Sequence, residues 1–221
     1  MTGKPEKRRL LTDREVAEMF RRLAGTINPK PELEFRSVFD LLVAVVLSAQ
    51  TTDKAVNQVT RVLWQTCRTP EDYLALGEEA LTEHIRSIGL FRHKCKAILG
   101  LCQALIERHH GQVPDDFEAL TALPGVGRKT ANVVLNVGFG RPVLAVDTHV
   151  FRVANRTGLV SAPTPEAVEA AALPRIPKCH RLHAHHYLLL HGRYVCQARR
   201  PACATCVLAG LCRQHLERPE A

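Results

Sequence analysis

Four of the eight cysteines lie within seventeen residues near the end of the sequence, with the spacing Cys196-x6-Cys203-x2-Cys206-x5-Cys212. Four thiolates in so short a segment can surround one metal centre, and both zinc and a 4Fe-4S cluster accept thiolate ligands. Structural zinc sites usually combine two CxxC pairs, whereas this segment has one such pair flanked by wider gaps. The spacing therefore predicts a metal centre and leaves zinc and iron–sulfur as alternatives.

A second segment whose residues could bind a ligand or take part in a reaction is 123–129, which reads Leu-Pro-Gly-Val-Gly-Arg-Lys. Pro124 blocks further helical hydrogen bonding, the two glycines permit backbone conformations that a side chain disfavours, and helical spacing resumes at Ala131. A glycine hairpin that leads into a helix presents N–H groups to an anion, and the helix dipole adds positive potential. We therefore predict a phosphate contact made by Gly125, Val126, Gly127 and Arg128, with Lys129 held beside it.

Two further segments carry candidate polar groups. Asp147 stands where a helix is expected to begin, so its carboxylate can cap that helix and can also stabilise positive charge on a substrate. His149 follows in the same turn, and we interpret it as a structural residue or a nucleic-acid contact. Arg199 and Arg200 lie between the first two clustered cysteines, where they suit a phosphate contact, with a solvated basic loop as the alternative.

The composition favours a polyanionic partner. Thirty Lys and Arg residues against 22 acidic residues give a formal charge of +8, although many basic proteins bind no nucleic acid. No apolar run reaches membrane-spanning length and no signal-peptide core follows the basic first residues, which we interpret as a mobile arm. We expect a soluble cytosolic protein with no membrane partner, in which clustered cysteines bind metal and the scattered ones are buried: Cys67, Cys95, Cys102 and Cys179.

The elements that position these groups are predicted to be helices, from the spacing of apolar residues. The segment 39–47 is apolar almost all round, which also permits a buried strand, but we interpret it as a central helix because its neighbours are helical. Helix starts are indicated at Thr12 and at Thr69-Pro70, and a last long helix is expected at about 180–191. With no convincing strand or repeat, the predicted class is all-α, with a domain boundary near Arg141-Pro142.

Several of these segments together resemble the bacterial endonuclease III family, in the helix-hairpin-helix superfamily. The likeness rests on the decapeptide 123–132, on Val-Asp-Thr-His-Val-Phe-Arg at 146–152, and on His-Gly-Arg-Tyr-Val-Cys at 191–196 with the four-cysteine spacing. It also covers Leu-Ser-Ala-Gln at 47–50 and Ser-Ile-Gly-Leu at 87–90, and so runs from about residue 35 to 213. A hairpin alone would be unspecific, because polymerases, ligases and helicases use such hairpins as passive DNA clamps.

This resemblance implies an all-helical, two-lobed enzyme of base excision repair with DNA across the cleft between the lobes. Residues 31–141 would form a six-helix barrel domain, and residues 1–30 with 142–221 an iron–sulfur domain. The four clustered cysteines would hold a 4Fe-4S cluster. The family combines DNA glycosylase and abasic-site lyase activities and prefers oxidised pyrimidines, so we expect a monomer that acts on double-stranded DNA containing damaged bases or abasic sites.

The resemblance also assigns roles to individual residues. Lys129 would be the nucleophile that attacks C1′ of the sugar, for which it must be a neutral amine, and we expect it to be partly buried. Asp147 would be its carboxylate partner. Gln50 and Leu90 would enter the duplex when the damaged base is extruded. Without the resemblance, the local sequence favours ordinary structural roles, with Gln50 in a loop or capping a helix and Leu90 buried after a glycine turn.

Two alternatives remain at this point. A monofunctional glycosylase, such as an adenine or mismatch-thymine enzyme, would share the hairpin and the cysteines but would typically lack a lysine at position 129. A non-catalytic DNA-binding module would explain the charge, the hairpin and a structural metal. It would give no reason for Lys129 and Asp147 together, and a strand-cleavage assay on abasic DNA separates the two.

Overall fold

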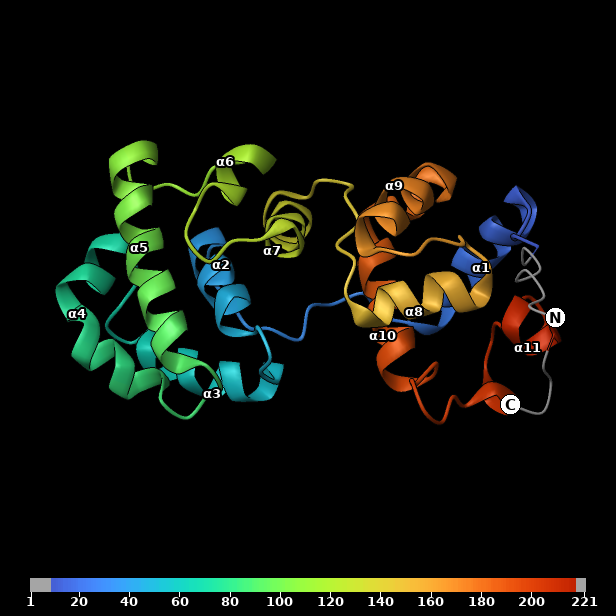
Figure 1. Ribbon diagram of the computed structural model, residues 1–221, viewed down its shortest axis with the longest axis horizontal. Coiled ribbons are helices and arrows are strands. Elements are labelled where there is room, and N and C mark those ends of the chain that lie inside the picture. Colours follow the sequence, from blue (N-terminus) through green and yellow to red (C-terminus); the bar gives the residue numbers. More distant parts are fainter. Residues whose placement is uncertain (1–8, 218–221) are drawn as a thin grey trace, which may run out of the picture. The chain divides into compact units, whose positions relative to one another are not determined.

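The computed structural model describes residues 9–217, so most of the predicted basic arm lies outside the described residues. The chain separates into two compact units (Figure 1): Pro31–Arg141, and Met1–Lys30 with Pro142–Ala221 as far as these are described. Residues 9–217 contain helices and no strand, which confirms the all-α prediction. Within that range, no helix has both the length and the apolar character needed to cross a bilayer.

The unit Pro31–Arg141 is built around one apolar helix. Its elements are α2 (Val38–Leu47), α3 (Asp53–Leu63), α4 (Pro70–Ile85), α5 (Phe91–His109), α6 (Phe117–Thr121), α7 (Arg128–Val133) and the π-helix η1 (Val134–Gly138). Nine of the ten residues of α2 are buried, and α3, α5 and α7 pack against it. The segment 39–47 is therefore a central helix, as its helical neighbours predicted.

Helix α4 is interrupted at Gly77, whose φ of 78° and ψ of 170° are not helical. Thr69 caps its first half, which has a proline in the first turn, and Leu81 and Ile85 of its second half are buried against the rest of the unit. This interrupted helix packs along the long α5, beside which it lies in Figure 1.

The other unit combines the first helix with the C-terminal part of the chain. Its elements are α1 (Asp13–Thr26), α8 (Thr148–Thr157), α9 (Pro165–Arg175), η2 (Lys178–His183), α10 (Ala184–Tyr194), η3 (Cys203–Thr205) and α11 (Arg213–Glu217). Phe20, Val150 and Leu188 lie in a shared core between α1, α8 and α10. The helix expected at 180–191 begins as a 3-10 turn and becomes α-helical only from Ala184, and the short α11 was not predicted.

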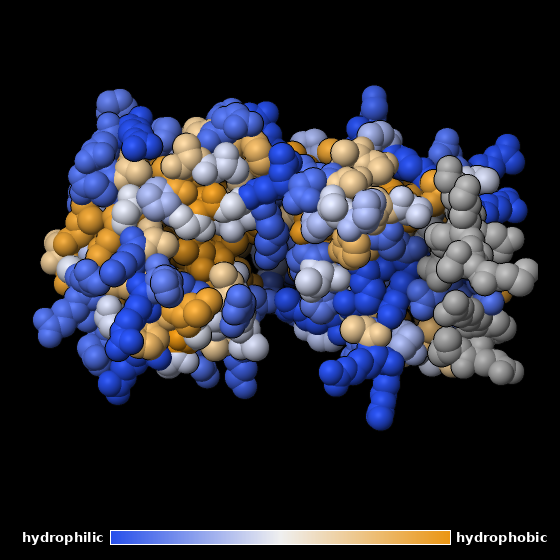
Figure 2. All heavy atoms as spheres, viewed as in Figure 1, coloured by the Kyte–Doolittle hydropathy of each residue, from blue (hydrophilic) through white to orange (hydrophobic). Residues whose placement is uncertain are grey.

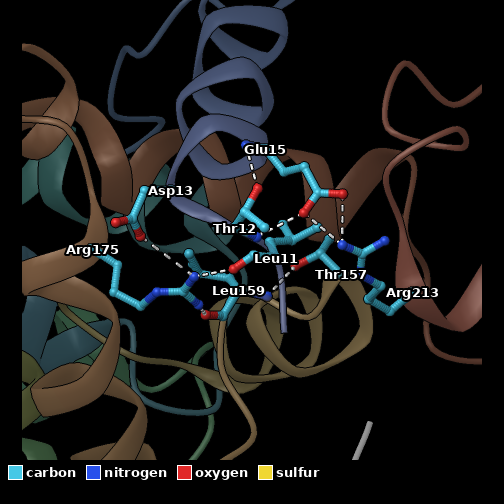
Figure 3. Close-up of polar contacts among 8 residues, drawn as sticks. All are labelled: Leu11, Thr12, Asp13, Glu15, Thr157, Leu159, Arg175 and Arg213. Carbon is cyan, nitrogen blue, oxygen red and sulfur yellow. Dashed lines mark hydrogen bonds and ion pairs between the residues drawn. The ribbon is translucent and has the colours of Figure 1, made fainter. Parts of the chain in front are cut away.

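Hydrogen bonds fix the start of α1 to later parts of the same unit (Figure 3). Thr12 and Glu15 form a capping box, and the Glu15 carboxylate also accepts two 2.6 Å hydrogen bonds from Arg213 Nη2. The Arg175 guanidinium donates to the carbonyl oxygens of Leu11 and Leu159. Hydrogen bonds from Thr12 and Arg213 lower the pKa of Glu15 to about 2. The first helix is thereby tied to residues more than 140 positions away.

Candidate functional site

The hairpin after Leu123 is docked on α5 through a glycine. Gly125 has a φ of 76°, and a Cβ at this position would lie 2.7 Å from the Cβ of Ala97. Glycine fits here because it adopts a positive φ readily and has no Cβ to clash with Ala97. Gly127 differs, because its φ is −92° and no atom lies within 4 Å of the position of a Cβ. Gly125 therefore seats the hairpin, while Gly127 leaves its outer side open at the start of α7.

The residues around Gly127 point in different directions. Val126 is buried, so a contact of this residue with a ligand would involve its backbone. The Arg128 guanidinium lies over the ring of Phe117, with Cζ 4.7 Å from the ring centroid. The side chain of Lys129 is exposed, and the expected partial burial is wrong within its unit. The reason is that α7 turns Ala131 and Val133 toward the core, which leaves its first turn at the surface.

Asp147 caps α8 with a single carboxylate oxygen. Its Oδ1 accepts hydrogen bonds from the backbone N–H groups of His149 at 2.9 Å and Val150 at 2.8 Å. Among residues 9–217, the second oxygen, Oδ2, has no hydrogen-bond donor. The chain before it is held by burial of Leu144 and by a 2.8 Å contact between Ala145 O and His185 Nδ1. The carboxylate is therefore fixed in place with one oxygen available.

A close approach of two helices supports this end of α8. A Cβ on Gly192 of α10 would lie 2.8 Å from the Cβ of His149. The Arg152 guanidinium lies 3.1 Å from His149 Nδ1 and donates to the carbonyl oxygens of Gly192 at 2.8 Å and Cys196 at 2.9 Å. His149 is half-buried between these groups, which agrees with its structural interpretation. Sequence reasoning missed Arg152 and Gly192, although both lie within the segments that carry the family likeness.

All four clustered cysteines line one hollow. The residues that form its wall are Thr157, His191, Val195, Cys196, Pro201, Ala202, Cys203, Cys206, Leu208, Ala209, Cys212 and His215. Burial raises the pKa values of the Cys206 and Cys212 thiols. Thiolates in this position therefore need a compensating positive charge, such as a bound metal centre.

Protein donors also face the sulfur atoms. Arg156 Nη1 lies 3.7 Å from Cys196 Sγ, the N–H of Leu208 lies 3.4 Å from Cys206 Sγ, and His191 Nε2 lies 3.6 Å from the same Cys206 sulfur. No group of three or more His, Cys, Asp or Glu side chains in the described part of the chain could hold a single metal ion. The four thiols thus share one hollow with these donors, and an all-thiolate set of this kind suits a metal centre.

Arg199 and Arg200 are exposed in the loop between the first two cysteines of the cluster. The Arg156 guanidinium holds the start of this loop through hydrogen bonds to Gln197 O at 2.7 Å and Ala198 O at 2.8 Å. The two arginines are therefore carried by an anchored loop, where both the phosphate contact and the solvated loop remain compatible with their exposure.

Gln50 and Leu90 lie on two neighbouring turns. Both have left-handed backbone conformations, with φ values of 53° and 59°. A Cβ on Gly89 would lie 3.6 Å from Gln50 O, so the turns lie close together. Gln50 is exposed and the Leu90 residue is 51% exposed, which rules out the simple interpretation of Leu90 as a buried residue.

The predicted site residues thus fall into three groups. Gln50 and Leu90 form one, and the hairpin with Lys129 forms another, both within the unit Pro31–Arg141. Asp147, His149, the four cysteines and the two loop arginines belong to the other unit. On the face drawn in Figure 2, hydrophilic side chains project from both units, and hydrophobic residues reach the surface most clearly on the unit Pro31–Arg141. Leu90 and Tyr194 are among the large hydrophobic residues that are exposed.

Comparison with known proteins gives one consistent family. Residues 43–178 match the model of the HhH-GPD superfamily, described as base excision DNA repair proteins. The chain is 57% identical to endonuclease III of Rickettsia conorii over 185 residues, covering 84% of this chain and 88% of that protein. It is 54% identical to endonuclease III of Treponema pallidum over 205 residues, covering 92% and 97%. A solved structure of a trapped endonuclease III–DNA covalent intermediate aligns with a TM-score of 0.90 and 45% identity, covering 96% of this chain and all of that one.

Proposed function

Because this chain belongs to the endonuclease III family of the HhH-GPD superfamily of base excision DNA repair proteins, we propose that its two units together perform one two-step reaction on DNA. The protein is a DNA glycosylase and abasic-site lyase of base excision repair. It releases a damaged base, in our proposal an oxidised pyrimidine, and then cleaves the strand on the 3′ side of the lesion. We further propose that it acts as a monomer in the bacterial cytoplasm, on double-stranded DNA.

Extrusion of the damaged nucleotide comes first, because a base cannot be excised inside the stack. Leaving the stack costs a few kcal/mol, and this cost is smaller where a lesion weakens pairing. The Gln50 amide can hydrogen-bond the orphaned partner base, and Leu90 can wedge beside it as an apolar group between base steps. Their exposure on two neighbouring turns supports these roles.

Lys129 carries the chemistry in this proposal. Its neutral amine attacks C1′ of the deoxyribose, and the base departs with the electron pair of the glycosidic bond and gains a proton. The lysine nitrogen gives up one proton and its lone pair then breaks the C1′–O4′ bond, so the sugar ring opens, O4′ takes up a proton, and an iminium joins C1′ to the lysine. The iminium acidifies the C2′ proton, whose removal breaks the C3′–O bond by β-elimination and releases the 3′ phosphate. Hydrolysis of the imine then frees the lysine. The observation that carries the proposal is an exposed lysine directly after the hairpin, since a passive clamp needs no amine at that point.

Asp147 is proposed as the carboxylate that assists this attack. A carboxylate near C1′ can stabilise positive charge on the sugar as the glycosidic bond breaks, or can accept the proton of Lys129 directly or through water. Capping of α8 occupies Oδ1 alone, so the same residue can fix the helix and offer Oδ2 to the reaction. The hairpin glycines with Arg128, and Arg199 and Arg200 on the cysteine loop, are proposed phosphate contacts.

The four clustered cysteines are proposed to hold a 4Fe-4S cluster. Their shared hollow and the burial of the thiols support a metal centre, and the single CxxC pair flanked by wider gaps favours the cluster over zinc. When bound, the cluster would supply a covalent crosslink for the loop that presents Arg199 and Arg200 to DNA.

Separate measurement of base release and strand cleavage tests the proposal. Duplexes carrying single defined lesions, including an oxidised pyrimidine, an adenine mismatch and an abasic site, are incubated with the protein under single-turnover conditions. We expect base release from the oxidised pyrimidine and cleavage of both this strand and the abasic strand. Base release without cleavage would indicate a monofunctional glycosylase, and binding without either product would indicate a non-catalytic module.

A further inference from the structure

Lys94 is a buried cation that the proposed chemistry does not use. It lies in the first turns of α5, is only 5% exposed, and burial lowers the pKa of its ammonium group. Its Nζ donates a 2.7 Å hydrogen bond to Thr51 Oγ1, which is its one side-chain partner among residues 9–217. Burial of a charged group with so little compensation is unfavourable. A leucine or methionine would fill the same space at lower cost, so the residue is not explained by packing.

The two bonds of Lys94 reach the two exposed turns. Its backbone N–H donates to Leu90 O at 3.1 Å, the first hydrogen bond of α5. Its ammonium holds the hydroxyl of Thr51, which directly follows Gln50 and itself lies 3.4 Å from Ala49 O. Lys94 therefore bonds to Thr51, the residue after Gln50, through its side chain and to Leu90 through its backbone.

Both turns require such support. Left-handed conformations are disfavoured for residues with a Cβ, and they persist where the surroundings fix them. Gln50 and Leu90 are two of the three non-glycine residues with positive φ among residues 9–217, and they occur on neighbouring turns. Leu90, as the residue that precedes α5, has no side-chain cap of its own.

We propose that Lys94 is a positioning residue that locks the turns of Gln50 and Leu90 into one rigid wedge before DNA binds. The inference rests on the proposed role of both residues in nucleotide extrusion. Two turns that are fixed in advance lose no further conformational freedom when they enter the duplex, so each contributes more to opening the base pair. Lys94 then acts on extrusion and leaves the reaction at C1′ to other residues.

Matched substitutions test this role. Lys94→Met retains the length of the side chain and removes the hydrogen bond, and Thr51→Val removes the accepting hydroxyl with little change in shape. Thr51→Ser keeps the hydroxyl. Lys96→Met is the control, because Lys96 is an exposed lysine of the same helix. Single-turnover base release is measured on one lesion in two settings, paired in a duplex and unpaired in a one-nucleotide bulge, where little extrusion work remains.

The expected signature is a change in the ratio of the paired rate to the unpaired rate. Lys94→Met and Thr51→Val each lower this ratio at least tenfold, and the double variant lowers it no further, since both remove the same bond. Thr51→Ser and Lys96→Met leave the ratio within twofold of the original. The Tm of Lys94→Met stays equal or rises, because an apolar residue replaces a buried charge, so a purely structural role cannot produce the same pattern.

Two results would overturn the inference. One is a Lys94→Met ratio equal to that of Lys96→Met, and the other is an equal fall of the paired and unpaired rates. If Lys94→Met does not fold, the same ratio of paired to unpaired rates is compared between Thr51→Val and Thr51→Ser, and equal ratios would overturn the inference. Failure of the unsubstituted protein to release any base would instead contradict the proposed function, so the two failures are distinguishable.

Discussion

Substitution by alanine should have different effects on the stability of the protein at the two glycines of the hairpin. In Gly125→Ala, the left-handed conformation costs the new residue roughly 1–2 kcal/mol. The added Cβ also stands 2.7 Å from Ala97 Cβ, and relief of such overlap typically costs about 1–3 kcal/mol. The variant should therefore lose about 2–5 kcal/mol of unfolding free energy. In Gly127→Ala, φ is −92° and the space is open, so stability should change by at most about 1 kcal/mol.

Gly127→Ala should instead affect DNA binding. The new methyl group of Gly127→Ala would occupy the open side of the hairpin, where we propose that a phosphate lies. Loss of that one contact should weaken binding at every salt concentration with little change in the slope of log affinity against log salt concentration, because the backbone N–H groups carry no net charge, and the fold should be kept. The assays are urea unfolding followed by circular dichroism, and fluorescence anisotropy with an abasic-analogue duplex at several salt concentrations.

A second substitution isolates the steric part of the effect. Ala97→Gly removes the atom that a Cβ at Gly125 would meet, at a cost of about 1 kcal/mol for a glycine within a helix. The double variant should be more stable than the sum of the two single effects by about 1–3 kcal/mol. Full additivity would refute the packing explanation. DNA binding of Gly127→Ala that matches the original protein at every salt concentration would refute the phosphate contact.

Three further outcomes are expected. Asp147→Asn should keep the cap of α8, and its stability should stay within about 0.5 kcal/mol of the original, but it should lose base release. Asp147→Ala should lose base release and also about 1 kcal/mol of stability in urea unfolding. An active Asp147→Asn variant would show that Asp147 takes no part in the chemistry. Burial, with nearby His185 and His183, lowers the pKa of His186 to about 4, so the folded state resists its protonation, and stability is lost as pH falls below about 6.5. Between pH 7 and 5.5 the protein should lose about 1 kcal/mol more than His186→Leu, and equal losses would contradict the assignment. The purified protein should contain about four iron and four sulfide per chain, and Cys206→Ala should lose both; a colourless, zinc-loaded, active preparation would exclude the cluster.

Much of the fold could be predicted from interactions between residues that are close in the sequence. The apolar face of 39–47, the cap at Thr12 and the proline start at residue 70 depend on nearest neighbours along the chain, and each lies in the helix that was expected. Asp147 also caps its helix as its position suggested. These features are readable from sequence because helix periodicity and capping involve residues at most four positions apart.

The features that were not predicted depend on contacts between distant segments. The turn of Leu90 lies near that of Gln50, forty positions earlier, and the bond from Lys94 to Thr51 joins the same two turns. Arg156 reaches the cysteine loop from α8, again about forty residues away. No periodicity signals such pairs, so their roles emerge only when the three-dimensional arrangement is known.

The account depends most directly on a covalent bond between Lys129 and the sugar. The protein is mixed with abasic-site DNA in the presence of borohydride, and the reduced adduct is digested and mapped by mass spectrometry. The unsubstituted protein and the exposed-lysine control Lys96→Ala should both form an adduct on the peptide that contains Lys129. Lys129→Ala should bind the same DNA without forming it. An adduct that persists in Lys129→Ala, or that maps to another amine of the unsubstituted protein, would contradict the proposed mechanism.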